Sequence, residues 1–412
     1  MKIGEIAKIA GIPVNAIRYY INLGLLIPKS KNKQYVFSEE DLQDLQTIIK
    51  LKTFHFSLND IHKIISLKRI SNLADRGDIE DYLRFFINQK NELQQQKKEL
   101  ETAINGLKQE ISAIQTLSDN HSCKTGVPLV MLDKIYCPHC QKPLTLKDAY
   151  IENQYILSGE FFCNCGYHAT IKDGILCTTG GYISPYDYPD LERSFYKNIP
   201  AAFISTLQKS YNWLLDHIAE AKPAGKVFFE DHMNAYVFSY RHIELMEKNA
   251  QYILADKYFE IVKMYKERID KLNLNLNILY IADATFELPL KNQCVDCFID
   301  FFSSNEYMFF NHRYLLNTID RYFHSGTKIF GTYFYFKPGS QSMKQAMLDY
   351  PETWEKNFDL LSFKKYFLEQ HHYDLIDEEP IGNVTDSGNN EAFSFHQKGE
   401  EMYLHSYEWE RK

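Results

Sequence analysis

The sequence predicts a multidomain protein whose N-terminal part is helical and whose C-terminal part is α/β. Residues 1–118 place apolar side chains at helical spacing, whereas short apolar strands alternate with helices over residues 226–334. A chain of 412 residues is too long for one ordinary domain. Residues 1–70 hold eleven basic and six acidic residues, a net +5, so the total of −8 leaves −13 for the remainder. This division indicates phosphate contacts confined to the basic end.

Two short helices are expected at the start of the chain. Ile3, Ile6 and Ile9 recur at helical spacing, Gly11 ends the first helix, and Pro13 suits the first turn of the second. Apolar side chains of the second helix face inward, which leaves a polar face. That face holds Asn15, Arg18, Tyr19 and Asn22. This is the layout of a helix-turn-helix, whose second helix enters the major groove of DNA.

The residues that follow make the pattern specific. Arg-Tyr-Tyr at 18–20, then Gly-Leu-Leu at 24–26 and Pro28, resembles the signature of the MerR family of bacterial transcription regulators. The resemblance continues through FSEEDLQDLQTIIKLKTFHFSLNDIHKII, where the family has its third and fourth helices after a small wing. It implies a winged helix-turn-helix DNA-binding domain at residues 1–75, with double-stranded promoter DNA and RNA polymerase as partners.

The wing departs from the family pattern. Lys33-Gln34-Tyr35 stands where the family usually carries Gly-Tyr-Arg. We therefore expect phosphate contacts from a different set of side chains in this region. The candidates are Lys29, Lys31, Lys33 and Tyr35.

A long polar helix is expected next, at residues 76–121. Leu93, Leu100, Leu107 and Ile114 are spaced by seven, and Ile104 and Ile111 occupy the other seam positions of the later heptads. This spacing predicts a short coiled coil. The family resemblance implies that the helix pairs with its mate and makes a homodimer. A helix packed on its own chain is the alternative.

Cysteine pairs predict a zinc ribbon at residues 122–180. Cys137/Cys140 and Cys163/Cys165 flank an expected hairpin of strands 149–157 and 160–162. Four thiolates at such spacing suit tetrahedral Zn²⁺ in a structural role, because no coordination position stays open. His139 or His168 is an alternative fourth ligand, and a ribbon that has lost its metal is the other possibility. Cys294 and Cys297 lie in an apolar run and are expected in a core.

Residues 181–412 are expected to form a doubly wound α/β domain. The predicted strands are 226–229, 252–255, 276–282, 297–302 and 327–334, and the predicted helices include 235–247 and 257–271. The first three strands end at Glu230, Asp256 and Asp283. ADATFELPLKNQCVDCFID, which contains Asp283, resembles a stretch of class I S-adenosylmethionine-dependent methyltransferases. With the ribbon ahead of it, this domain resembles ribosomal RNA guanine methyltransferases.

The methyltransferase resemblance has one large departure. Those enzymes carry a Gly-x-Gly-x-Gly turn after the first strand, where the backbone approaches the cofactor. The matching residues 230–236 contain no glycine. We therefore expect a Rossmann-like methyltransferase fold that is not an enzyme, with binding of S-adenosylmethionine doubtful.

A ligand pocket is still expected at the carboxyl ends of the strands. The candidate ligand residues are Glu230, Asp231, Tyr236, Asp256 and Asp283. Carboxylates beside aromatic rings suit a small apolar cation as effector. Solvated acids at strand ends and aromatic rings in the core are the alternative explanation.

Three functions follow from these features. The favoured one is a dimeric transcription regulator that senses a small molecule through a non-catalytic domain and distorts promoter DNA. The alternatives are an active nucleic-acid methyltransferase brought to DNA by the N-terminal domain, and a metal-responsive regulator. No apolar run reaches the length of a membrane span and the first helix starts at once, so a cytoplasmic location without membrane contact is expected.

Overall fold

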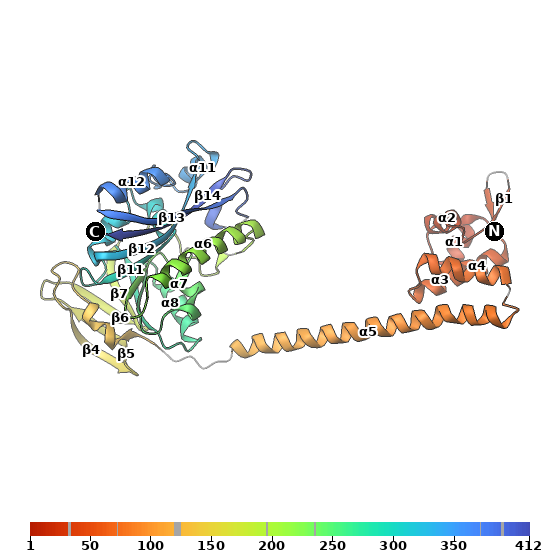
Figure 1. Ribbon diagram of the computed structural model, residues 1–412, viewed down its shortest axis with the longest axis horizontal. Helices are drawn as coiled ribbons and strands as arrows, with labels where there is room; N and C mark the ends of the chain where they lie inside the picture. Colours follow the sequence, from red (N-terminus) through yellow and green to blue (C-terminus); the bar gives the residue numbers. More distant parts are fainter. Residues whose placement is uncertain are drawn as a thin grey trace. The chain divides into compact units, whose positions relative to one another are not determined.

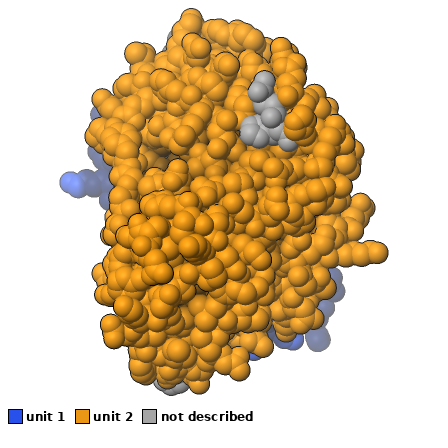
Figure 2. Space-filling view, turned by 90° about the vertical axis from the view of Figure 1, so that its left-hand side faces the viewer, with its two compact units in different colours: residues 1–119 blue, residues 120–412 orange. Residues whose placement is uncertain are grey.

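The computed structural model describes all residues except 32–33, 72, 119–124, 195–196, 235, 371 and 389–390. The chain divides into two units, residues 1–119 and 120–412 (Figure 1). Figure 2 colours the two units separately. Each unit has its own hydrophobic core. No helix among the described residues is long and apolar enough to cross a membrane.

Among the described residues, unit 1 consists of five helices and a two-stranded wing. Its elements are α1 (Ile3–Ala10), α2 (Val14–Asn22), β1 (Lys29–Lys31), β2 (Gln34–Val36), α3 (Glu39–Thr53), α4 (Leu58–Ser71) and α5 (Arg76–Ser118). Gly11 ends α1 in the left-handed region at φ 68°, as expected. Ser38 caps α3, because its hydroxyl accepts a hydrogen bond from the Asp41 N–H at 3.2 Å. Ile6, Ile17 and other apolar residues of α1 to α4 form the core.

Unit 2 is built on one large mixed sheet. Its strands are β3 (Val127–Pro128), β4 (Thr145–Glu152), β5 (Tyr155–Phe162), β6 (His168–Lys172), β7 (Ile175–Gly181), β8 (Val227–Glu230), β9 (Gln251–Asp256), β10 (Asn277–Ala284), β11 (Val295–Phe301), β12 (Phe323–Phe336), β13 (Tyr373–Val384) and β14 (Met402–Arg411). The sheet order is β13-β14-β12-β11-β8-β9-β10-β7-β6-β5-β3, with β4 on β5.

The strand order identifies the architecture. Counted from β8 as the first strand, the parallel strands lie in the order 3-2-1-4-5, which is that of a Rossmann sheet. The antiparallel strand β14 is inserted between β12 and β13. From β8 the following strands are added on one side of the sheet as β9 and β10, and then on the other side as β11 and β12. The topological switch point therefore lies at the carboxyl ends of β8 and β11.

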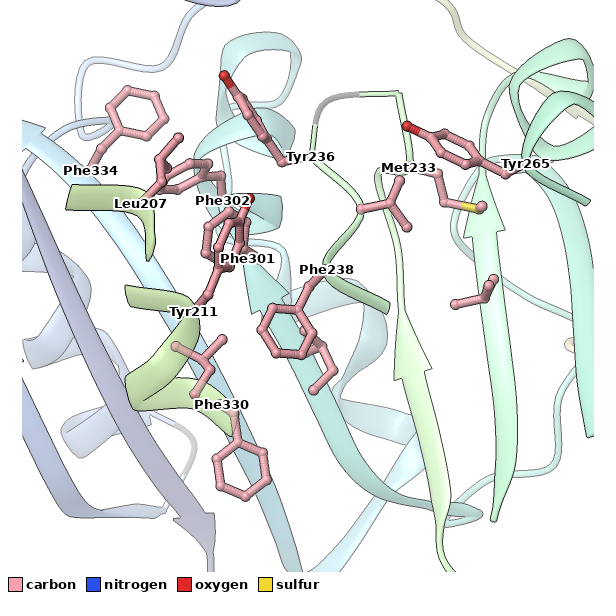
Figure 3. Packing of buried hydrophobic residues seen from close by; sticks show 14 of the residues in the cluster. Leu207, Tyr211, Met233, Tyr236, Phe238, Tyr265, Phe301, Phe302, Phe330 and Phe334 are labelled. Atoms are coloured by element: carbon pink, nitrogen blue, oxygen red, sulfur yellow. The ribbon is translucent and has the colours of Figure 1, made fainter. Parts of the chain in front are cut away.

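Helices cover both faces of this sheet (Figure 1). They are α6 (Ala201–Glu220), α7 (Phe238–Arg241), α8 (Phe259–Asp270), α9 (Ser303–Phe310), α10 (Leu316–Ile319), α11 (Gln341–Asp349) and α12 (Leu360–Gln370). Alternate strand residues enter two cores: Phe228 joins α6 and α8 on one face, and Phe229 joins α10 and α12 on the other. Figure 3 shows part of the first core.

Two expected elements differ from the structure. The helix expected over 235–247 is replaced by the short α7 and a 3₁₀ turn at Ile243–Leu245, because residues 231–234 pack as a buried turn. The first ribbon strand, expected over 149–157, is broken at Asn153 and Gln154, which take positive φ values in the turn between β4 and β5.

The ribbon and the α/β strands share the sheet. Strand β7 pairs in parallel with β10, so the ribbon extends the sheet at the edge of the α/β strands. Gly181 faces Ala284 in this pairing at φ 93°, and a Cβ on Gly181 would lie 2.7 Å from the Cβ of Ala284. The close approach and the left-handed backbone both require glycine.

Candidate functional site

The four predicted metal ligands converge at the tip of the ribbon. The Sγ atoms of Cys137, Cys140, Cys163 and Cys165 all lie within 4.8 Å of one another. The closest pairs are Cys137 with Cys165 at 3.4 Å and Cys140 with Cys163 at 3.3 Å. Tetrahedral zinc with Zn–S bonds of about 2.3 Å places sulfurs about 3.8 Å apart, so the cluster fits this ion.

Neither candidate histidine joins the cluster. Among the described residues, the group of possible ligand atoms contains cysteines alone. The Nε2 atom of His168 lies 3.8 Å from the Glu160 carboxylate, and the His139 ring packs edge-on to Tyr167. Four cysteine side chains could therefore surround one metal ion as a tetrahedron, an arrangement that leaves no coordination position open.

The turn that carries Cys137 and Cys140, here called the cysteine knuckle, is hydrogen-bonded to the loop after β10. The Tyr136 N–H donates to the Pro289 carbonyl at 3.1 Å, and the Gln141 side chain accepts from the Asn292 N–H at 2.8 Å. The Arg321 guanidinium donates to the Pro138 carbonyl at 2.5 Å. A metal that orders the knuckle consequently also supports the edge of the α/β strands.

The turn after β8 fills the place where the methyltransferase resemblance puts glycines. Asp231, His232, Met233 and Asn234 are all buried. His232 takes φ 56°, so an ordinary side chain occupies a left-handed position that suits glycine. Its ring stacks on Phe286 with centroids 4.5 Å apart, and its Nδ1 lies 3.0 Å from an Asp231 oxygen.

Backbone N–H groups donate hydrogen bonds to two of the predicted ligand carboxylates, those of Glu230 and Asp256. Both oxygens of Glu230 accept N–H groups, from Phe238 at 2.6 Å and Ser239 at 2.8 Å. Burial raises the pKa of Glu230 to about 7. Asp256, which is fully buried, accepts from Asn234 and from Tyr258, each at 2.8 Å.

The third strand-end acid, Asp283, serves its own loop. One of its oxygens accepts the N–H groups of Thr285 and Phe286 at 2.7 and 2.6 Å, and the other accepts the Thr178 hydroxyl. The ligand roles of Glu230, Asp256 and Asp283 remain predictions. In this conformation their carboxylate oxygens accept hydrogen bonds from donor groups of the protein itself.

A separate pocket opens at the switch point. It is small, because the space that the centre of a water-sized molecule can occupy is about 50 Å³. Tyr236, the predicted ligand residue after β8, lines it together with Phe302 and Glu306 after β11. The other lining residues are Tyr186, Asp187, Tyr188, Asn234, Phe309, Phe310, Phe334, Tyr350, Ala392, Phe393 and Phe395.

Sequence reasoning missed the two acids of this pocket. Asp187 lies in the segment before α6 and pairs with Lys257, whose side chain is buried. Glu306 lies in α9. Neither stands at the end of a strand, the position that drew attention to the other acids. Tyr-Asp-Tyr at 186–188, an acid between two aromatic residues, is a signal that could have drawn attention to Asp187.

The polar face of α2 is free in unit 1. Asn15, Arg18, Tyr19 and Asn22 are all exposed, and Tyr19 keeps 52% of its surface accessible. Ile17 and Leu25 are fully buried, as expected. In the wing, Lys29 and Tyr35 are exposed on β1 and β2. Lys33 and the side chain of Lys31 lie outside the described residues.

Comparison with known families addresses this helical unit directly. The family model described as "MerR HTH family regulatory protein" matches residues 1–68. These residues are a MerR-type helix-turn-helix domain. Within it, α2 is the second helix of the helix-turn-helix and β1–β2 is the wing, so the exposed Arg18 and Tyr19 lie on the helix that this motif places in the major groove.

Curated relatives match the same MerR-type domain. The chain is 37% identical over 75 residues to "HTH-type transcriptional regulator ZntR homolog" of Haemophilus influenzae, which covers 17% of this chain and 54% of that protein. It is 30% identical over 71 residues to "HTH-type transcriptional regulator HmrR" of Sinorhizobium medicae, covering 17% and 48%. The chain thus spans about half the length of the curated relatives it matches.

Solved structures resemble the region beyond the MerR-type domain. One is a "putative sarcosine dimethylglycine methyltransferase" from Galdieria sulphuraria, with TM-score 0.37, 10% identity, and coverage of 49% of this chain and 85% of that chain. Another is the MccD protein, with TM-score 0.38, 15% identity, and coverage of 48% and 96%. The large mixed sheet of unit 2 has the Rossmann-like arrangement of a methyltransferase fold.

Proposed function

We propose that this protein is a dimeric transcription regulator that binds promoter DNA through its MerR-type domain and senses a small molecule through unit 2. The observation that supports this most strongly is the family match at residues 1–68 combined with the exposed polar face of α2. A recognition helix needs side chains that are free to reach base edges, and Arg18 is suited to guanine. Lys29 and Tyr35, which are exposed on the wing, are proposed to contact the phosphate backbone of the DNA.

Dimerisation is proposed through α5. Leu100, Ile104, Leu107, Ile111 and Ile114 are each between 50% and 64% exposed. Their heptad spacing makes one apolar stripe on a helix of 43 residues. An exposed apolar stripe of this kind is buried when two helices pair, which favours a homodimer. A dimer would present two recognition helices to two half-sites of one DNA duplex.

The same proposal makes unit 2 a sensor without methyl transfer. The methyltransferase fold and the retained Asp256 and Asp283 favour an enzyme as the second candidate. Against it, the buried side chains of residues 231–234 occupy the turn where close backbone approach to the cofactor is needed. Asp256 also already accepts two backbone N–H groups. The four cysteines are proposed to hold Zn²⁺ as a structural ion.

Regulation would act through the geometry of DNA. A dimer that bends or untwists its operator changes how RNA polymerase engages the promoter, and the deformation energy depends on the relative placement of the two α2 helices. An effector shifts this balance only by binding two dimer geometries with different affinity.

In vitro selection tests the proposal. The full-length protein is incubated with a pool of random DNA duplexes, and bound sequences are amplified over several rounds. We expect an inverted repeat to be enriched by the wild-type protein and lost with Arg18→Ala. Arg241→Ala, which removes an exposed arginine of α7, should select the same repeat. Absence of any enriched sequence, or an unchanged repeat with Arg18→Ala, would count against the proposal.

A further inference from the structure

The four cysteines of the ribbon differ in their access to solvent. Cys140 and Cys165 are exposed, Cys163 is half-buried and Cys137 is fully buried. Each of the two closest sulfur pairs joins an exposed cysteine to a less exposed one. The Sγ of Cys165 lies 3.4 Å from that of Cys137, and the Sγ of Cys140 lies 3.3 Å from that of Cys163. A small oxidant from solvent can therefore reach one sulfur of each pair, and a second sulfur lies beside it.

Both close pairs connect two different turns of the ribbon. Cys137 and Cys140 belong to the cysteine knuckle, whereas Cys163 and Cys165 lie in the turn between β5 and β6. The sulfurs of each pair must approach by about 1.3 Å to reach the disulfide bond length of about 2.05 Å. Disulfides in these pairs would join the same two turns that a bound zinc ion joins.

The other described cysteines lie in surroundings that oppose oxidation. Burial raises the pKa of Cys294 and of Cys297 to about 12 each, and the pKa of Cys177 to about 11. These three side chains are therefore thiols at neutral pH, and the thiolate, not the thiol, is the reactive form. A cysteine that coordinates zinc is deprotonated. Reactive sulfur is thus concentrated in the ribbon when zinc is bound.

We propose that Cys140 and Cys165 are sites of reversible oxidation by peroxides, at which the ribbon exchanges its zinc ion for the disulfides Cys137–Cys165 and Cys140–Cys163. The inference rests on the zinc site of the proposed function and not on DNA binding. It adds a chemical reaction to a site whose closed coordination otherwise gives it a structural role only.

The reaction takes two steps at each pair. The exposed thiolate attacks one oxygen of the peroxide, the O–O bond breaks, and a sulfenic acid and a hydroxide ion are formed. The neighbouring thiolate then attacks the sulfenic sulfur, so that an S–S bond forms and a second hydroxide leaves. Over both pairs, two peroxide molecules accept four electrons from four thiolates. The negative charges that hold Zn²⁺ are lost, so the ion is released to solvent.

The oxidised ribbon should keep its attachment to the α/β strands. The cysteine knuckle is held there by hydrogen bonds from Tyr136 to Pro289 and from Asn292 to Gln141. Disulfides hold the knuckle against the second turn as zinc does, and they reduce the conformational entropy of the unfolded chain. Chelation removes zinc without supplying any such link. Oxidised protein should therefore unfold at a higher temperature than chelated, reduced protein.

Peroxide treatment of the full-length, zinc-loaded protein tests the inference. Zinc content is measured first, and release is then followed with the chromogenic chelator 4-(2-pyridylazo)resorcinol, with and without hydrogen peroxide. We expect peroxide to release about one zinc ion per chain. Trypsin without reductant should yield peptides 135–147 and 148–172 joined to each other, since Lys142 precedes a proline. Electron-transfer fragmentation of the joined peptides assigns the cysteine pairs. Dithiothreitol with added Zn²⁺ should restore both zinc content and thermal midpoint.

A control variant and four outcomes decide the matter. Cys177→Ser, which changes a cysteine outside the cluster, should release zinc as the wild type does. The inference is overturned by retention of zinc under peroxide that fully oxidises free cysteine, by a Cys137–Cys140 disulfide within one peptide, by sulfinic or sulfonic acids in place of disulfides, or by failure of dithiothreitol and Zn²⁺ to reverse the change. A wild type that holds no zinc before treatment overturns the zinc site of the proposed function as well, which separates that failure from failure of the oxidation step alone.

Discussion

The backbone N–H of Asn234 donates to Oδ2 of Asp256 at 2.8 Å. Asp256 ends the second strand of the Rossmann order, where the methyltransferase resemblance places the carboxylate that binds the ribose hydroxyls of the cofactor. Its other oxygen accepts the Tyr258 N–H at 2.8 Å, and the side chain is fully buried. The turn that lacks glycine thus also donates a hydrogen bond to Asp256, the carboxylate that a cofactor would need.

This arrangement predicts that S-adenosylmethionine does not bind. The cofactor would have to displace the buried residues 231–234 and break the hydrogen bond from Asn234 to Asp256. We expect the thermal midpoint of the full-length protein to be the same with and without millimolar S-adenosylmethionine or S-adenosylhomocysteine, because a ligand that binds the folded state raises the midpoint. A clear rise with either compound, abolished in Asp256→Ala, would restore the enzymatic alternative.

Loss of the metal should weaken unit 2 beyond the ribbon. The knuckle that holds Cys137 and Cys140 is hydrogen-bonded to the loop after β10. We expect about one zinc per chain by mass spectrometry under native conditions, and a lower thermal midpoint of unit 2 after chelation. Cys163→Ser should reproduce both effects. Cys177→Ser, which changes a cysteine outside the cluster, should keep the metal; a metal-free wild type of unchanged stability would refute the structural role.

The apolar stripe of α5 should determine the oligomeric state. Leu107 is 63% exposed and lies in the middle of the stripe. Leu107→Lys is expected to convert the dimer to a monomer, because it places two charges in the proposed helix–helix seam. Sedimentation velocity distinguishes the two states. Lys108→Ala, one residue away on a different face of the helix, serves as the control, and a variant Leu107→Lys that stays dimeric would locate the interface elsewhere.

The pKa of Glu230 predicts how stability depends on pH. Burial raises this pKa from the ordinary value of 4.5 to about 7, so the folded protein keeps a proton that the unfolded chain releases near pH 4.5. The stabilising contribution is complete below the unfolded pKa and is lost as pH rises towards about 7. Denaturant unfolding between pH 5 and 7 should therefore show a shallower decline for Glu230→Gln than for wild type. The exposed Glu244→Gln should behave as wild type, and identical slopes for all three proteins would contradict the raised pKa.

Local signals in the sequence predicted much of this architecture. The end of α1 at Gly11, the convergence of the four cysteines and the apolar strands β8 to β12 each depend on residues close together in the chain. The buried packing of Cys294 and Cys297 is also confirmed. Patterns of this kind are read from neighbouring residues, because helical and strand periodicity are local properties.

Features that depend on distant residues were not predictable. The pairing of β7 with β10 joins the ribbon to the α/β strands across about a hundred residues of sequence, and no local pattern specifies it. Asp187 and Glu306 meet in one pocket only because the switch point brings their segments together. The helix expected after Glu230 is shortened because the turn at 231–234 is held by tertiary contacts, which override local helix propensity.

Footprinting on a selected duplex tests the central claim most directly. The full-length protein is bound to the inverted repeat that it enriches, and the protected deoxyribose positions are mapped by hydroxyl-radical cleavage. A dimer with one α2 helix in each of two major grooves should protect two symmetric half-sites whose centres lie about 10 base pairs, or a multiple of that, apart. A single protected patch without two-fold symmetry, or protection that is the same on any sequence, would contradict the account.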